Sequence, residues 1–309
     1  MSFYGNTFTF DGQSCADFGL MMYDIDNKSS NTNKVISGKS VVEDTSNFRW
    51  KSYFYGTNYG DKLSFDLIFG VNIERIELHR YLDRTEIHNI AAWLTSHNQY
   101  KYLEIEQEDM LSIRYRCIIT SLEVTEYDLL PYTLKATVEC DSQFAYMLPQ
   151  TFRYAVDGYK KVQLYNYSAY DGYYYPKMEI ALDSNYFLTK DEKFAEWKKY
   201  YTKSGDTYTE TNVIKGDEIP ADTYYERGNF SIINYTDESR LTYFAALPSD
   251  VTKIVVDNDK NIISCNGGQN IYPYFNYKFF RLNKGNNSLG IYGNGSISIT
   301  CEFPVCVGG

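Results

Sequence analysis

Alternation of apolar and polar residues with a period of two is the feature that most constrains the fold of this chain. It is clearest in residues 63–69, 132–140 and 297–303, which lie far apart in the sequence. In the first of these segments, leucine and phenylalanine occupy every second position. Because successive side chains of a strand point to opposite faces of a sheet, this pattern is typical of strands with one buried face. We therefore expect a mainly β protein.

The abundance of aromatic residues supports the same fold class. The chain has 32 tyrosine and 18 phenylalanine residues among 309, and such side chains favour strands because they pack well on a pleated, half-buried surface. At roughly 100–200 residues per domain, this length predicts two domains. We place them at residues 1–150 and 151–309.

The charge balance and the apolar runs argue against several classes of function. The chain has 30 basic and 40 acidic side chains, a formal net charge of −10, whereas affinity for nucleic acid comes mostly from lysine and arginine. The longest apolar stretch, Phe18–Tyr23, is far shorter than the ~20 residues that span a bilayer. The N-terminus has no basic and apolar signal segment. We expect no sequence-specific nucleic acid binding, no membrane insertion, and folding in a reducing cytoplasm.

One helix interrupts the strands of the first domain, between Asp83 and Ser96. Asp83 is a good N-cap, and Glu86 stands at the spacing of a capping box. Apolar residues then recur at i, i+3, i+4 and i+7 from Ile87, which gives a single stripe that would face a sheet.

The second domain contains short strand-like segments separated by turn signals, a pattern that suggests a β-sandwich or a small barrel. Gly290–Gly295 lie between two such segments, and we interpret them as a hairpin turn. Residues 186–228 differ from the rest, because a helix-like segment at 190–200 is followed by tyrosine-rich turns. We interpret them as a hairpin module inserted into a surface loop, where an insertion costs little.

No arrangement of residues indicates catalysis or a bound cofactor. The three histidines, His79, His88 and His97, are nine residues apart, so neighbours would lie on opposite faces of a helix. The six cysteines are scattered without a Cys-x-x-Cys pair, and those within strand-like segments are typical of small buried hydrophobes. The common hydrolase and nucleotide-binding motifs are absent from the sequence. We expect no catalytic residue, no metal and no cofactor.

A group of tyrosines in the second domain is the candidate binding surface. Its members are Tyr173, Tyr174, Tyr175, Tyr272 and Tyr274. They could form a platform on which sugar rings stack. They could equally be interface or core aromatics, since tyrosine is common in interfaces.

Several segments together resemble the distal tail proteins of long-tailed bacteriophages, the siphophage tail-component family. Phe8–Ser14 followed by Asp17–Leu20 resembles the usual start of that family, and Cys140–Tyr146 resembles the motif that closes its first domain. Val256–Ile263 resembles a hairpin of the family, and Gly293–Thr300 its final strand pair. Residues 186–228 depart from the family pattern.

The resemblance implies a structural virion protein at the distal end of the tail. The first domain would be a β-sandwich or split barrel with one helix, and it would build a homohexameric ring that continues the tail tube and lets DNA pass. The second would be a galectin-like, carbohydrate-module-like β-sandwich that projects outward. The implied partners are the tail tube protein, the tail-tip protein and the receptor-binding proteins.

Such a ring would have a lumen, and the net charge of the chain predicts that the lumen is acidic. An acidic lumen would repel the DNA duplex and let it slide. The candidate contributors form an acidic run in the first domain: Glu104, Glu106, Glu108 and Asp109. A solvated outer edge is the alternative interpretation of this run.

Two other classes of function stay open at this point. The chain could be a binding module whose second domain grips a cell-wall polysaccharide. It could also be a cell-wall hydrolase with an unrecognised carboxylate pair, although no pair is singled out among the 40 acidic residues.

Overall fold

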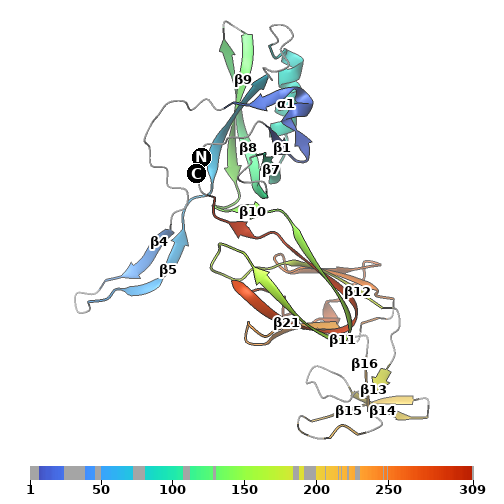
Figure 1. Cartoon of the computed structure of the whole chain (residues 1–309). Coiled ribbons are helices and arrows are strands. Elements are labelled where there is room, and N and C mark those ends of the chain that lie inside the picture. Colours follow the sequence, from blue (N-terminus) through green and yellow to red (C-terminus); the bar gives the residue numbers. More distant parts are fainter. Residues whose placement is uncertain are drawn as a thin grey trace. The chain divides into compact units, whose positions relative to one another are not determined.

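The computed structural model divides the chain into two compact units, Met1–Leu148 with Pro304–Gly309, and Pro149–Phe303. Each unit is mainly β, as the alternation predicts (Figure 1). The described residues are 7–23, 39–45, 50–71, 81–106, 112–127, 130–183, 188–190, 200–205, 207–214, 216, 218–220, 223–226, 230–245, 247–248 and 250–307.

The first unit is built on a nine-stranded antiparallel sheet. Seven of its strands follow the order β2-β1-β7-β8-β9-β6-β3, while β10 pairs with β8 and β22 pairs with β10. Their bounds are β1 Phe8–Phe10, β2 Gln13–Ser14, β3 Leu20–Met22, β6 Ser64–Val71, β7 Lys101–Ile105, β8 Ile113–Tyr127, β9 Leu130–Cys140, β10 Ala145–Met147 and β22 Pro304–Val305. The predicted strands at 63–69 and 132–140 correspond to β6 and β9, which pair with each other.

The predicted helix is confirmed as α1, Arg84–Thr95. Asp83 is its N-cap, and the reciprocal bonds of a capping box join Asp83 and Glu86 at 2.8 and 3.0 Å. Trp93 anchors the helix, because its ring stacks on Phe18 with centroids 4.7 Å apart. Its indole N–H also donates a hydrogen bond to the carbonyl of Phe10 at 3.2 Å.

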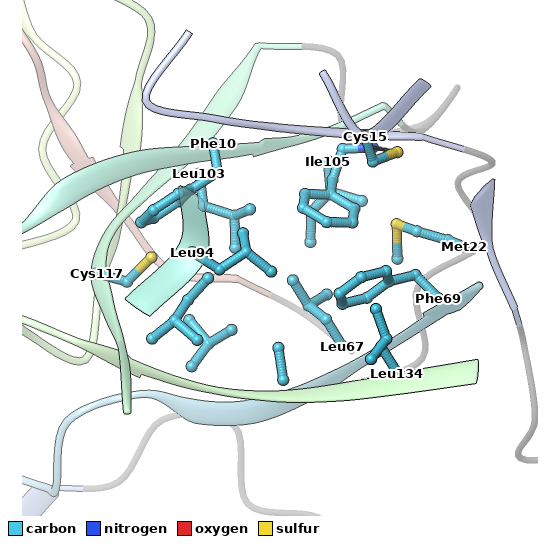
Figure 2. Packing of buried hydrophobic residues seen from close by; sticks show 14 of the residues in the cluster. Phe10, Cys15, Met22, Leu67, Phe69, Leu94, Leu103, Ile105, Cys117 and Leu134 are labelled. Carbon is cyan, nitrogen blue, oxygen red and sulfur yellow. Dashed lines mark hydrogen bonds between the residues drawn. The ribbon is translucent and has the colours of Figure 1, made fainter. Parts of the chain in front are cut away.

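The core of the first unit is one cluster of buried side chains from its sheet and from α1 (Figure 2). Alternate residues of β6 and β9, such as Phe69 and Leu134, are completely buried. Cys117 and Cys140 are buried free thiols in this core, and burial raises the pKa of Cys140 to about 12. These two cysteines therefore behave as small apolar side chains, as predicted.

The C-terminal end of the chain belongs to the first unit. β22 pairs antiparallel with β10, with Ala145 opposite Val305, and Val307 is buried in the first core. The predicted second domain, residues 151–309, therefore extends too far. The segment from Pro304 onward belongs to the first unit. The physical reason is that this segment completes the edge beside β10 and fills the first core.

The second unit contains a seven-stranded sheet of order β18-β17-β21-β12-β19-β20, with β11 paired to β21. All these pairings are antiparallel. The bounds are β11 Gln150–Asn166, β12 Lys177–Leu182, β17 Phe230–Asn234, β18 Arg240–Phe244, β19 Lys253–Asp257, β20 Ile262–Cys265 and β21 Gly285–Cys301.

The predicted hairpin turn at Gly290–Gly295 is wrong, because β21 runs through it without interruption. β21 pairs with β11 over its whole length, whereas on its other edge it pairs with β17 through Leu289–Tyr292 and with β12 through Gly295–Thr300. Gly293 and Gly295 lie at this change of partner with φ of 135° and 137°. The glycines therefore allow one long strand to bend between two halves of the sheet.

The inserted segment forms a four-stranded sheet of its own, in the order β13-β16-β14-β15. Its strands are β13 Leu188–Lys190, β14 Tyr200–Ser204, β15 Thr207–Thr211 and β16 Thr223–Glu226. The predicted helix at 190–200 falls largely outside the described residues. Its two ends are strand residues, since Lys190 ends β13 and Tyr200 begins β14.

Candidate functional site

Tyr174, one of the predicted platform residues, is half-buried and used in packing within the second unit. Its backbone pairs with that of Leu282, and its ring packs against Phe303 with centroids 4.9 Å apart. Its hydroxyl accepts a hydrogen bond from the N–H of Glu302 at 2.6 Å. Burial raises the pKa of this phenol. The ring and the hydroxyl of Tyr174 are thus engaged in internal contacts.

Tyr173 and Tyr175 flank Tyr174 and are exposed to 42% and 37%. The guanidinium of Arg281 lies 3.5 Å from the centre of the Tyr173 ring. It also donates two hydrogen bonds, of 2.7 and 3.0 Å, to Asp237, whose side chain is only 4% exposed. These bonds to Asp237, with a further one to Tyr175, raise the pKa of Arg281. One arginine therefore holds both exposed tyrosines in place.

Tyr272 serves a different purpose. Its hydroxyl accepts a hydrogen bond from the N–H of Ile263 at 3.1 Å and donates one to the carbonyl of Asn261 at 3.0 Å. It therefore holds the turn between β19 and β20. Tyr274 lies in the same short helical turn, half-buried, and its carbonyl accepts a hydrogen bond from Ala245. The structure thus divides the predicted group: Tyr173 and Tyr175 both interact with Arg281, whereas Tyr272 and Tyr274 share one short helical turn.

The sequence analysis missed a second group of tyrosines, in which Tyr159 and Tyr235 are exposed and Tyr292 is half-buried. Tyr159 of β11 and Tyr292 of β21 are directly opposite each other, with ring centroids 4.5 Å apart. The hydroxyl of Tyr235, which follows β17, lies 3.3 Å from that of Tyr292. We call this group the tyrosine face. Two long-range pairings, β11 with β21 and β17 with β21, bring its members together, so no local sequence signal marks it.

The strands β4 Lys39–Asp44 and β5 Tyr53–Tyr59 form a separate two-stranded sheet, which Figure 1 shows as a hairpin ribbon. Apolar side chains on it are largely in solvent, with exposed fractions of 56% for Val41, 65% for Phe54 and 68% for Tyr55. A two-stranded sheet alone is marginally stable in water, and exposed apolar patches are typical of interaction sites. We call β4 and β5 the apolar hairpin.

The candidate lumen acids are described in part. Glu104 is exposed on β7 and lies opposite Arg114 of β8. Glu106 is exposed after β7, and its carboxylate accepts a hydrogen bond from the hydroxyl of Thr7. Glu108 and Asp109 lie outside the described residues.

Histidine and cysteine form no metal centre within the part of the chain that the structure describes. His97 lies beside Asp11, with its Nε2 3.2 Å from the carboxylate, and Lys101 contacts the same carboxylate at 2.8 Å. His79 lies outside the described residues. No helix among the described residues has both the length and the apolar character of a membrane span.

Both units contain segments that match known domains of phage tail proteins. The description "Phage tail protein N-terminal domain" matches residues 3–142, and "Phage tail C-terminal domain" matches residues 218–301. No similar sequence is found among curated proteins. Together, the two domain matches show that this chain belongs to a family of phage tail proteins.

The fold is similar to that of the Dit protein of phage SPP1, described as a paradigm of the hub adsorption apparatus in phages that infect Gram-positive bacteria. The likeness has a TM-score of 0.54 at 11% identity and covers 96% of this chain and 98% of that one. A component of the phage p2 baseplate in its activated conformation gives a TM-score of 0.44 at 10% identity, over 92% of this chain and 90% of the other. The resemblance to distal tail proteins is therefore confirmed at the level of fold.

Proposed function

We propose that this phage tail protein is the distal tail hub, a homohexameric ring that joins the tail tube protein to the tail-tip protein. The observation that carries the proposal is the match of the whole chain to the fold of a hub protein, over 96% of its length. In this proposal the protein is made and folded in the host cytoplasm, resides at the distal end of the virion tail, supports receptor-binding proteins and has no enzymatic activity.

The apolar hairpin supports self-association. Phe54 and Tyr55 are about two-thirds exposed, and a hairpin of two strands gains little stability until its faces or edges are covered. A second copy of the chain would cover them in a ring. A closed ring is the ordinary outcome when one surface of a subunit binds a different surface of the next.

Passage of DNA is the second element of the proposal, and it requires that the lumen does not bind phosphate. Glu104 and Glu106 are exposed at the end of β7, although Arg114 offsets part of this charge. The net charge of −10 per chain favours an acidic lumen once six copies are assembled. An experimental structure of the ring with a lumen lined mainly by lysine and arginine would contradict this element alone.

Native mass spectrometry of the full-length protein tests the ring. Six copies of a 35.9 kDa chain give 6 × 35.9, or about 215 kDa. We expect this species for the wild type, and a shift toward monomer for a Phe54→Ser, Tyr55→Ser double variant. Tyr277→Ser is the matched control, because Tyr277 is 64% exposed outside the hairpin. Monomer alone for the wild type, even with the tube or tip protein added, would refute the proposal.

A further inference from the structure

We propose that the tyrosine face of the second unit, formed by Tyr159, Tyr235 and Tyr292, binds a neutral polysaccharide. This binding goes beyond the hub function and does not depend on the ring. The proposal rests on how the three rings are held, on the chemistry of the side chains around them, and on the exposure of the rings to solvent.

The three rings form one preorganised platform. Tyr159 and Tyr292 are 4.5 Å apart between ring centroids, and the hydroxyls of Tyr235 and Tyr292 are 3.3 Å apart. The phenol of Tyr235 also interacts with that of Tyr159, and burial together with this interaction raises the pKa of Tyr159. Because the rings are already fixed, a ligand would not lose affinity to their ordering.

A glycine makes room for the platform. A Cβ atom at Gly290 would lie 2.6 Å from the hydroxyl oxygen and 2.9 Å from a ring carbon of Tyr235, so this ring lies directly over the backbone of β21. The φ of Gly290 is not in the left-handed region, and its backbone conformation therefore does not demand glycine. Glycine is required at position 290 because the Tyr235 side chain occupies the space that a Cβ atom would need.

The platform is open to solvent. Tyr159 is 48% exposed and Tyr235 is 39% exposed, even though both contact Tyr292. A pyranose ring has an apolar C–H face, which packs on aromatic rings, and hydroxyl groups, which need polar partners at the edge of the platform.

Those polar partners are present. Side chains two residues apart share one face of a strand. On β11, Tyr159 therefore shares its face with Asp157, Lys161 and Gln163. The charge of Lys161 acts on the Tyr159 phenol, and Asp157 on the other side of Tyr159 has the opposite charge. Because these two charges oppose each other, the face favours a neutral glycan over an anionic polymer.

The apolar hairpin gives the contrast that separates a glycan from a protein partner. There, aliphatic and aromatic side chains such as Val41 and Phe54 are exposed together, which is the composition of a protein interface core. Around Tyr159, the flanking side chains of β11 on the same face are charged or carry an amide. The tyrosine face therefore fits a hydroxyl-rich ligand.

Affinity electrophoresis of the full-length protein tests the inference. Native gels would contain a soluble dextran, a mannan, a galactan or a mixed-linkage glucan, with polygalacturonate as the anionic polymer. We expect retarded migration in at least one neutral polysaccharide. Tyr159→Ala and Tyr292→Ala should each weaken this binding by about tenfold, the effect of losing one aromatic contact.

Two further variants separate ring contact from hydroxyl contact, and a third is the control at another exposed tyrosine. Gly290→Ala should tilt Tyr235 and weaken binding, while Tyr292→Phe should keep most of it. Tyr277→Ala, at a tyrosine 64% exposed outside this face, should bind as the wild type does. Thermal unfolding confirms that each variant is folded.

Four results would overturn the inference. The first is unretarded migration of the wild type in all four neutral polysaccharides. The second is retardation by polygalacturonate alone. The third is glycan binding that survives Tyr159→Ala and Tyr292→Ala in folded protein, which would place the glycan elsewhere. Binding of a protein to this face with no effect of glycan would count against it equally. None of these results bears on the mass of the ring.

Discussion

Alanine at Gly295 tests the bend of β21, on which the architecture of the second unit depends. A Cβ atom there would lie 2.0 Å from the carbonyl oxygen of Ala181 and 3.1 Å from the Cα of Leu182. Both are backbone atoms of β12, which is hydrogen-bonded between β21 and β19. The neighbouring strand therefore cannot move aside without breaking its own pairing.

Two costs add in the Gly295→Ala variant. The φ of 137° is one that only glycine adopts readily, and forcing another residue into it costs roughly 1–3 kcal/mol. Overpacking against the backbone of β12 adds roughly 1–3 kcal/mol. Their sum, about 4 kcal/mol, is a large part of the 5–15 kcal/mol that typically stabilises a protein.

Gly158→Ala is the matched control. Gly158 has a φ of 76°, but no atom lies within 4 Å of the Cβ position, so only the backbone cost applies, roughly 1–3 kcal/mol. The difference between the two variants therefore measures the close approach of β12 to β21.

Urea unfolding followed by circular dichroism gives the two free energies of unfolding, and amide hydrogen exchange assigns the loss to β12 and β21. We expect Gly295→Ala to lose about 2 kcal/mol more than Gly158→Ala. Equal losses, within about 0.5 kcal/mol, would refute the reasoning. If Gly295→Ala does not fold at all while Gly158→Ala does, the argument holds in its strongest form.

Three further predictions concern ion pairs and metals. Asp237→Asn should destabilise the second unit by about 2 kcal/mol, the usual contribution of charge-assisted hydrogen bonds, since Arg281 would stay charged in a partly buried site; an unchanged urea midpoint would contradict this. A hydrogen bond from Lys101, assisted by His97, lowers the pKa of Asp11. That carboxylate therefore stabilises the fold above its unfolded pKa of about 3.9, and the stability is lost as pH falls through the lower folded pKa. Asp11→Asn should consequently flatten the pH dependence of Tm below about pH 4, and a curve with the wild-type slope would count against the ion pair. EDTA should leave Tm unchanged, and a drop that zinc or calcium reverses would reveal a metal site.

The elements that the sequence predicts correctly are those with local causes. The helix α1 needs only the capping box at Asp83 and Glu86 and the apolar stripe that follows. The strands β6 and β9 need only their alternation, because a period of two defines a buried face regardless of the partner strand. Both signals lie within about fifteen residues of chain.

The bend at Gly293 and Gly295 could not be recognised in the same way. Glycines with positive φ serve a hairpin turn and a bent strand equally well. What distinguishes the two is that β12 and β17 pair with successive halves of β21. Those strands lie far from β21 in the sequence, so the local pattern contained no information on the choice.

The tyrosines show the same limit for the candidate site. Alternation places Tyr173 and Tyr175 opposite Tyr174, but it does not say which side meets the core. The structure decides this through Phe303 and Glu302, which cover Tyr174. Selecting consecutive tyrosines therefore combined a half-buried, internally packed residue with two exposed ones.

Tyrosine count alone also cannot say what an exposed ring contacts, since the same residue serves protein interfaces and glycan sites. The neighbours decide. On the apolar hairpin, Phe54 and Tyr55 stand with exposed valines, and the exposure of this surface to water costs free energy that burial against another protein would recover. On the tyrosine face, Tyr159 stands between Asp157 and Lys161, whose charged groups would bind water or, in our proposal, sugar hydroxyls at the edge of the rings. Under the two proposals above, one aromatic-rich chain would assemble through its first unit and present a glycan platform on its second.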